Sequence, residues 1–126
     1  MELPVLGGIA RRALDQLLKN PYRTIEVRSA RNVIVARRLK AREKLFLTYE
    51  TPQDITRGTE GIIAEVMKIE EMEQRIPWEE SDEREITVCR IQLRLVGLGK
   101  VIEVSSEDDI MKVKVREMLP QEMAMS

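Results

Sequence analysis

The 126 residues are 43% hydrophobic and 34% charged with a net charge of −1, which predicts one folded soluble domain and excludes a disordered chain. With no histidine and one cysteine, Cys89, the chain excludes a disulfide framework and a Ser-His-Asp triad, and we expect neither a metal nor a cofactor. No run approaches the roughly 18 apolar residues of a membrane span and the N-terminus lacks a signal-peptide pattern, so we expect a cytoplasmic protein without membrane contact.

Charge is distributed unevenly along the chain. Residues 1–48 hold 11 Lys and Arg against 4 Asp and Glu, whereas residues 49–126 hold 10 against 18. A basic N-terminal part that folds onto one side of the molecule would attract phosphate. The alternative is that both parts interleave in one sheet and neutralise each other. Aromatic residues make up only 3% of the chain, which weakens recognition of bases by stacking but leaves recognition by charge open.

The chain begins with a short apolar segment, residues 3–6, that predicts a strand. A glycine pair then permits a turn, and residues 9–19 place apolar side chains on one helical face and charged side chains on the other. Lys19 favours the C-terminal end of a helix, and Pro21 prevents its continuation. The sequence therefore predicts an amphipathic helix that ends just before the proline.

Residues 22–28 alternate as a strand does. The two apolar side chains lie on one face, while Thr24, Glu26 and Arg28 share the other face at a spacing of about 6.5 to 7 Å. This face combines a hydroxyl, a carboxylate and a guanidinium, which is the mixture of donors and acceptors that a ligand site needs. The alternative is an ordinary solvated strand face with cross-strand ion pairs.

The middle of the chain changes from helical to strand periodicity. Residues 29–40 have a strand-like apolar run, but Ser29 or Asn32 can cap a helix and the basic end of the segment suits a helix terminus, so we favour a helix. Strands are predicted over residues 44–49 and 59–69. The glutamate-rich segment 72–84 is predicted to be a surface excursion.

The last third of the chain predicts three further strands, up to residue 118. A change of hydrophobic phase near Cys89 predicts a bulge or a change of buried face there, and Gly97 and Gly99 predict a tight turn. These elements together predict an α+β fold, a mostly antiparallel, partly closed β-barrel with one or two short helices near the N-terminus. Residues 1–119 are expected to form this single domain, and residues 120–126 a loose C-terminal tail.

Two kinds of chemistry are open to the charged residues. The carboxylates of Glu26 and Glu65 are weak candidates for general acid–base catalysis, because some pair among 22 acidic residues is expected to meet by chance. An arginine-rich groove suits phosphate, since guanidinium forks bind phosphate oxygens. The alternative is ordinary surface arginine paired with the acidic part of the chain. The candidate groove residues are Arg11, Arg12, Arg23, Arg28, Arg31, Arg37 and Arg38.

Three segments resemble a known family. Residues 20–28 (Asn-Pro-Tyr-Arg-Thr-Ile-Glu-Val-Arg), 44–48 and 58–66 (Gly-Thr-Glu-Gly-Ile-Ile-Ala-Glu-Val) are similar to the ASCH branch of the PUA-like barrels. Over its full length, the chain also resembles a small archaeal family known only as a domain of unknown function. The ASCH resemblance implies a PUA-like barrel with a cleft between the first helix and the strands, and a ligand that is RNA or nucleotide-like.

The resemblance also bears on catalysis. It implies that the cleft is lined by Arg23, Thr24, Glu26 and Arg28. Some ASCH relatives are small amidohydrolases that act on modified cytidine, with Lys and Thr at the positions that Arg23 and Glu26 occupy here. Since Arg does not readily release a proton, the resemblance argues against that hydrolase mechanism in this chain.

We therefore expect a non-catalytic module that binds RNA or a nucleotide. One alternative is a small hydrolase acting on a modified nucleoside, with Glu26 or Glu65 as the base. Another is an oligomeric structural or adaptor protein, such as a homo-oligomer, with the acidic excursion at residues 70–85 or the last strand as its contact surface. The residues expected at the binding site are Arg12, Arg23, Thr24, Glu26, Arg28 and Arg31.

Overall fold

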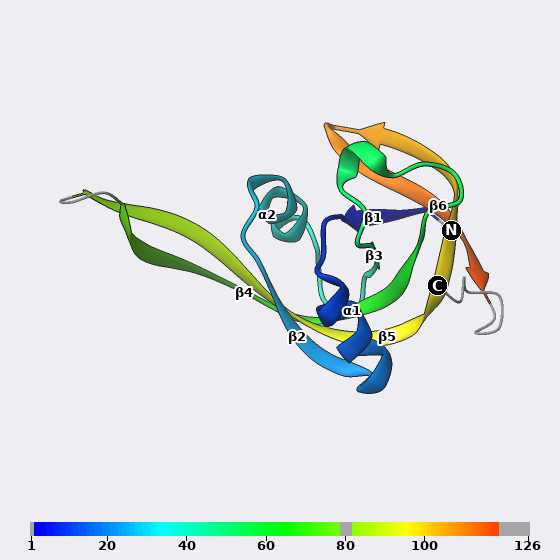
Figure 1. Ribbon diagram of the computed structural model, residues 1–126, viewed down its shortest axis with the longest axis horizontal. Helices are drawn as coiled ribbons and strands as arrows, with labels where there is room; N and C mark the ends of the chain where they lie inside the picture. Colours follow the sequence, from blue (N-terminus) through cyan, green and yellow to red (C-terminus); the bar gives the residue numbers. More distant parts are fainter. Residues whose placement is uncertain (1, 79–81, 119–126) are drawn as a thin grey trace.

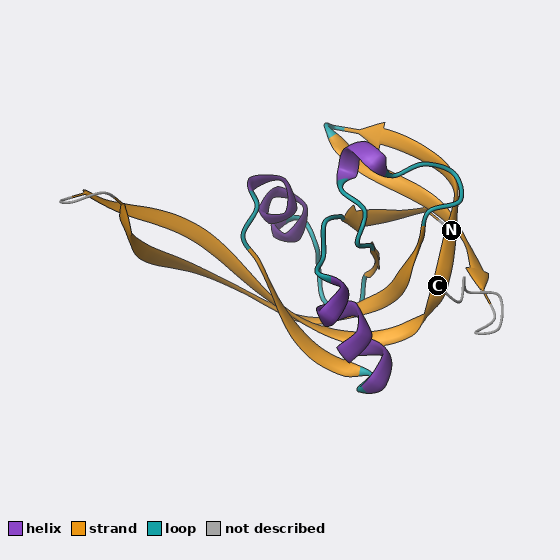
Figure 2. Ribbon diagram, viewed as in Figure 1, coloured by secondary structure: helices purple, strands orange, loops and turns teal. Residues whose placement is uncertain are grey.

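The computed structural model describes residues 2–78 and 82–118. Strands and helices alternate in the first half of the chain, and long strands make up the second half (Figures 1 and 2). The elements are β1 (Glu2–Leu6), α1 (Arg11–Lys19), β2 (Tyr22–Val27), α2 (Ala30–Arg37), β3 (Lys44–Leu47), the 3-10 turn η1 (Pro52–Asp54), β4 (Glu60–Trp78), β5 (Asp82–Glu107) and β6 (Ile110–Met118). The predicted α+β class with two helices near the N-terminus is confirmed.

The strands form one sheet in the order β2-β5-β4-β3-β1-β6, and β6 also pairs with β5. Five strands therefore close into a ring of hydrogen-bonded neighbours, with β2 attached outside the ring along β5. All pairs are antiparallel except β1 and β3, which are parallel, so the prediction of a mostly antiparallel sheet is confirmed. The ring closes because β5, with 26 residues, is long enough to pair with β2, β4 and β6.

Strand β3 separates two hydrophobic clusters. Leu45 and Leu47 point into a cluster that includes Leu17 of α1 and Val33 of α2, whereas Phe46 points into a second cluster with residues of β1 and β6. These three side chains are at most 1% exposed. A strand that is covered on both faces shows a continuous apolar run, not an alternating one, and this explains the sequence Leu-Phe-Leu.

Local side-chain chemistry explains where α1 ends and where α2 begins. In α1 the apolar stripe packs Leu17 into the core, and Pro21 ends the helix while its carbonyl accepts a hydrogen bond from the Leu95 amide at 2.7 Å. In α2 the Ser29 hydroxyl accepts a hydrogen bond from the Asn32 amide at 3.2 Å. This N-cap favours a helix where the apolar run alone was ambiguous, and the predicted helix is confirmed.

The structure corrects the predicted turn at Gly97 and Gly99 and the predicted bulge near Cys89, and it shows that the surface excursion after residue 72 is formed by strands. The segment from residue 72 onwards continues β4 and β5 as a two-stranded arm that extends away from the ring, with Met72 opposite Val88 (Figure 1). Gly97 and Gly99 lie within β5, not in a turn. The register shifts between β4 and β5 fall between residues 63 and 64 and between 66 and 68, not near Cys89.

The apparent phase change at Cys89 has a packing cause. Val88 and Cys89 are consecutive and both fully buried, so both faces of β5 are covered at the base of the arm. The alternation of buried and exposed side chains along β5 is therefore interrupted there, although the pairing register with β4 does not change.

The predicted tail, residues 120–126, lies outside the described residues. Neither helix in the described part of the chain has the length and apolar character needed to span a bilayer.

Gly61 permits the close approach of β4 to β3. A Cβ atom at this position would overlap the Leu47 carbonyl oxygen and lie 2.5 Å from the Phe46 ring, whereas a Cβ at Gly97 would meet nothing within 4 Å.

We expect Gly61→Ala to lower the free energy of unfolding by about 1 to 3 kcal/mol in urea denaturation, because it overpacks a filled site. Gly97→Ala is the matched control and should change it little. Equal stability of the two variants would contradict this packing.

Candidate functional site

A cleft of about 930 Å³ opens beside the edge strand β2. Its walls are β2, the loop 7–10 that leads into α1, the first residues of α2 and the segment around η1, and Arg90 of β5 adds one side chain. Four chain segments that are distant in sequence therefore meet at one hollow. Of the predicted site residues, Arg23, Thr24, Glu26 and Arg28 all line it.

The position of β2 at the edge of the sheet explains how side chains from both its faces reach one cleft. Arg23 lies on the same face as the buried Ile25, whereas Thr24 and Glu26 are exposed on the other face. Pro21 and Leu95 lie opposite each other and share a hydrogen bond. Along an antiparallel ladder such pairs alternate with pairs that share no hydrogen bond, and Thr24 and Glu26 belong to the second kind in their pairing with β5. Thr24 and Glu26 thus direct their backbone groups away from β5, and the cleft wraps around this free edge.

Glu26 is held by two guanidinium groups. Its Oε2 accepts a hydrogen bond from Arg28 Nη2 at 2.8 Å, and its Oε1 accepts one from Arg90 Nε at 3.0 Å. The pairs are partly solvent-exposed, so each contributes little to stability but fixes the three side chains relative to one another. The charged side chains in the described lining are Arg23, Arg28, Arg90 and Glu26, which leaves an excess of two positive charges.

Arg23 is the least satisfied polar group of the cleft. Its Nε is buried and finds no hydrogen-bond partner within the described residues. A buried N–H without an acceptor costs about 1 to 3 kcal/mol, and more when the group is charged. Since the Nε is not accessible to solvent, an acceptor in the cleft reaches this donor only after a movement of the Arg23 side chain.

The two helices contribute their N-terminal ends to the same hollow. Ala10, which precedes α1, provides no side-chain cap, whereas Ser29 caps α2. The first turn of a helix carries free backbone N–H groups and a partial positive charge. Both ends therefore add to the positive potential that the arginines create.

The glycine loop at the cleft floor is fixed by hydrogen bonds. The buried side-chain amide of Asn32 donates a hydrogen bond from Nδ2 to the Gly7 carbonyl at 2.9 Å, and the backbone N–H of Gly8 donates one to the Glu50 carbonyl at 2.8 Å. Gly8 has a φ of +66°, which favours glycine. A Cβ at Gly7 would lie 2.9 Å from the Glu50 carbonyl oxygen, so this loop needs glycine for its close approach.

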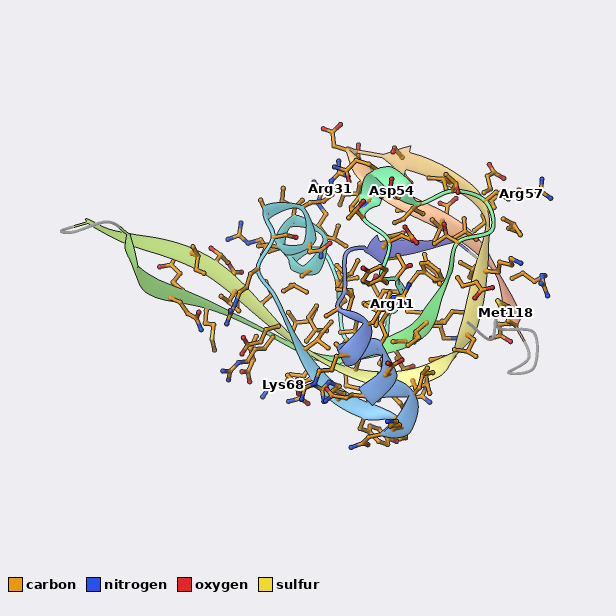
Figure 3. All side chains as sticks on the ribbon, in the orientation of Figure 1. Arg11, Arg31, Asp54, Arg57, Lys68 and Met118 are labelled. Carbon is orange, nitrogen blue, oxygen red and sulfur yellow. The ribbon has the colours of Figure 1, made fainter. Side chains whose placement is uncertain are left out.

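Other predicted site residues lie elsewhere. Arg12 is exposed on α1 outside the cleft lining, and Arg31 lines a separate cavity of about 340 Å³ between α2, η1 and the β5–β6 turn (Figure 3). Glu65 lies on β4, where it accepts a hydrogen bond from Arg94 Nε at 3.2 Å. That hydrogen bond raises the pKa of Arg94. Glu26 and Glu65 therefore do not share one cleft.

Part of the basic segment is neutralised by the acidic part, as the alternative interpretation of the charges predicts. Arg37 of α2 donates two hydrogen bonds to Glu71 of β4, at 2.6 and 3.0 Å.

Burial raises the pKa of the Cys89 thiol, which disfavours a reactive thiolate. Among the described residues, no group of three or more His, Cys, Asp or Glu side chains is arranged to hold a metal ion.

The sequence did not reveal every residue of the site. Arg90 reaches the cleft because it lies opposite Glu26 in the β2–β5 pairing, and no local pattern links residues so far apart. Asn32 gave only the signal of a possible helix cap. Gly7 and Gly8 signalled a turn but not its role as the floor of a cleft.

Fold and site together define a sheet-rich α+β domain with a cationic cleft at the edge of its strand ring. Residues 1–115 match the family described as "Protein of unknown function (DUF473)", and the chain belongs to this family. A relative, "Uncharacterized protein MJ0105" from Methanocaldococcus jannaschii, is 30% identical over 106 residues, which are 84% of this chain and 68% of the relative. The predicted membership of an archaeal family of unknown function is confirmed.

The fold is shared with proteins of known structure. The N-terminal domain of Lon protease from the Mycobacterium avium complex is similar with a TM-score of 0.53 and 14% sequence identity. The similarity covers 99% of this chain, and this chain spans 59% of that one. At this identity the similarity shows the fold alone.

Proposed function

We propose that the protein is a non-catalytic module that binds RNA or a nucleotide by its phosphate in the cleft beside β2. The observation that carries the proposal is Arg23, which lines the cleft and whose buried Nε lacks a hydrogen-bond partner among the described residues. A phosphate oxygen is the acceptor that a guanidinium binds best, because the N–H fork matches the geometry of the oxygens.

The other groups of the cleft support an anionic ligand. Arg28 and Arg90 supply further positive charge, while Thr24 and Ser29 offer hydroxyl groups. The uncapped start of α1 offers backbone N–H groups. A volume of about 930 Å³ suffices for a nucleotide-sized ligand. The proposal places the protein in the cytoplasm, where its single cysteine stays reduced.

The state of the carboxylates favours binding over catalysis. Within the described lining Glu26 is the one carboxylate, and both of its oxygens accept hydrogen bonds from guanidinium groups. Glu26 keeps acceptor capacity because each carboxylate oxygen has two lone pairs, but the described lining contains no second carboxylate that could act as its partner acid. This arrangement supports a positioning role for Glu26, which orients Arg28 and Arg90.

The finer assignment of the fold belongs to the same proposal. The ring of strands with a helix beside an edge strand fits a PUA-like barrel, and the segment from Arg23 to Arg28 fits its ASCH branch. In this assignment the cleft beside β2 corresponds to the ligand cleft that the resemblance implies.

Arg23→Ala tests the proposal directly. We expect it to weaken binding of a short single-stranded RNA by about 1.5 to 3 kcal/mol, because a charge-assisted hydrogen bond is lost. It should also reduce the slope of log affinity against log salt by about 0.7, the value for one phosphate contact to a single strand. Fluorescence anisotropy over a series of salt concentrations measures both quantities.

Arg12→Ala is the matched control for this experiment. Arg12 belongs to the same basic segment but is exposed outside the cleft, so its removal should leave affinity nearly unchanged. The proposal is wrong if the protein binds no RNA, if binding is insensitive to salt, or if the Arg12 and Arg23 variants lose equal affinity.

A second candidate, a homo-oligomeric adaptor, is favoured by the β4–β5 arm. The two strands extend beyond the ring (Figure 1), and a two-stranded hairpin is only marginally stable in water without a packed face. An adaptor of this kind is expected to show a mass above that of the monomer by light scattering, rising with protein concentration. A constant monomer mass at the highest concentration would argue against it.

A further inference from the structure

A second hollow lies across the start of α1 from the cleft. This groove of about 720 Å³ is lined by one side of α1, by Tyr49 and Glu50, and by the segment from residue 56 to the start of β4. Ala10 and Ala13 face the cleft, whereas Arg11 and Leu14 face the groove. The two hollows thus share the first turn of α1 as a dividing wall.

The dividing wall is held rigidly. The Gly8 amide donates to the Glu50 carbonyl at 2.8 Å, and the Ile9 amide donates to the Thr48 carbonyl at 3.0 Å. The segment from Thr51 to Gln53 lines the cleft directly after Tyr49 and Glu50 line the groove. A ligand in the cleft can therefore extend into the groove along a surface that these hydrogen bonds hold in place.

An exposed aromatic ring marks the groove. The Arg11 guanidinium carbon lies 4.5 Å from the centre of the Tyr49 ring, and Tyr49 is 50% exposed. Arg11 lies between α1 and the chain leading to η1 in Figure 3. Aromatic rings and guanidinium planes are the surfaces on which unstacked bases bind.

The groove and the cleft have opposite charge. The groove lining contains Asp15, Glu50, Asp54 and Glu60 against Arg11 and Arg57, an excess of two negative charges, whereas the cleft has an excess of two positive charges. A phosphate is disfavoured in the groove. A neutral base is not disfavoured there, because it carries no charge, and the carboxylates can accept hydrogen bonds from its exocyclic amino group.

We infer that the groove at Arg11 and Tyr49 is a nucleobase subsite, which prefers a base with an exocyclic amino group, for the RNA whose phosphate occupies the cleft. The inference rests on the proposed function and deepens it. The strand passes along residues 49–53, which line the groove and then the cleft, with a phosphate on Arg23 and a neighbouring base stacked on Tyr49. One aromatic side chain suffices for this arrangement, so the low aromatic content of the chain is no obstacle.

The test compares two ligands with the same phosphates. Hexaadenylate carries bases, and a hexamer of abasic ribose phosphates does not. We expect the wild-type protein to bind hexaadenylate about tenfold more tightly than the abasic hexamer, as one stacked base provides. Tyr49→Leu should remove this difference without changing the affinity for the abasic hexamer, while Tyr49→Phe keeps it. Isothermal titration calorimetry at one salt concentration measures all affinities.

The outcomes separate the two proposals. Equal affinity of the wild-type protein for both hexamers overturns the base subsite but leaves phosphate binding intact. Absence of binding to both hexamers, or an Arg23→Ala variant that binds both as wild type does, overturns the proposed function itself. Hexainosinate, in which oxo groups replace the amino groups, should bind several-fold more weakly than hexaadenylate. Equal binding of these two would overturn the preference for an amino group.

Discussion

The antiparallel pairing of β2 with the middle of β5 determines the geometry of the whole site. β2 is bound on one side only, and this pairing places Glu26 opposite Arg90. A shift of one residue would reverse every side chain of β2, exposing Ile25 and Val27 and burying Glu26. Burial of these two apolar side chains therefore fixes the register, and the register fixes the charged groups.

The same pairing leaves Arg23 in an unusual position. On the inner face of β2 its side chain is partly covered, so its Nε is cut off from water without gaining a partner among the described residues. The guanidinium group is not able to relieve this cost by deprotonation. In the proposed function, a bound phosphate would recover that hydrogen bond and would give the cleft a stronger preference for anions than exposed arginines alone provide.

Local patterns in the sequence predicted local structure well. The amphipathic stripe before Pro21 and the alternation of residues 22–28 correspond to α1 and β2, and the Thr24, Glu26 and Arg28 side chains do line a cleft together. The ring closure, the arm and the role of Arg90 were not predictable. Each depends on which distant strands pair, and strand pairing is set by packing between segments far apart in the chain.

In two cases a sequence signal did not give the position of a residue in the fold. Gly97 was interpreted as part of a turn because glycine is common in turns, but here it lies within a strand and leaves space open beside β5. Arg12 and Arg31 were grouped with Arg23 by sequence proximity, yet α1 and α2 direct them to other surfaces. A count of charges along the chain gives no information about the faces on which they lie.

The central claim is that the Arg23 Nε–H binds the phosphate of the ligand. Nitrogen-15 spectra of the arginine Nε–H groups test it most directly, with Arg23→Lys identifying the resonance. On titration with single-stranded RNA, the account predicts a large shift of the Arg23 signal and slower exchange of its proton with water. An Arg23 signal that stays unchanged while the RNA saturates the protein would contradict the account.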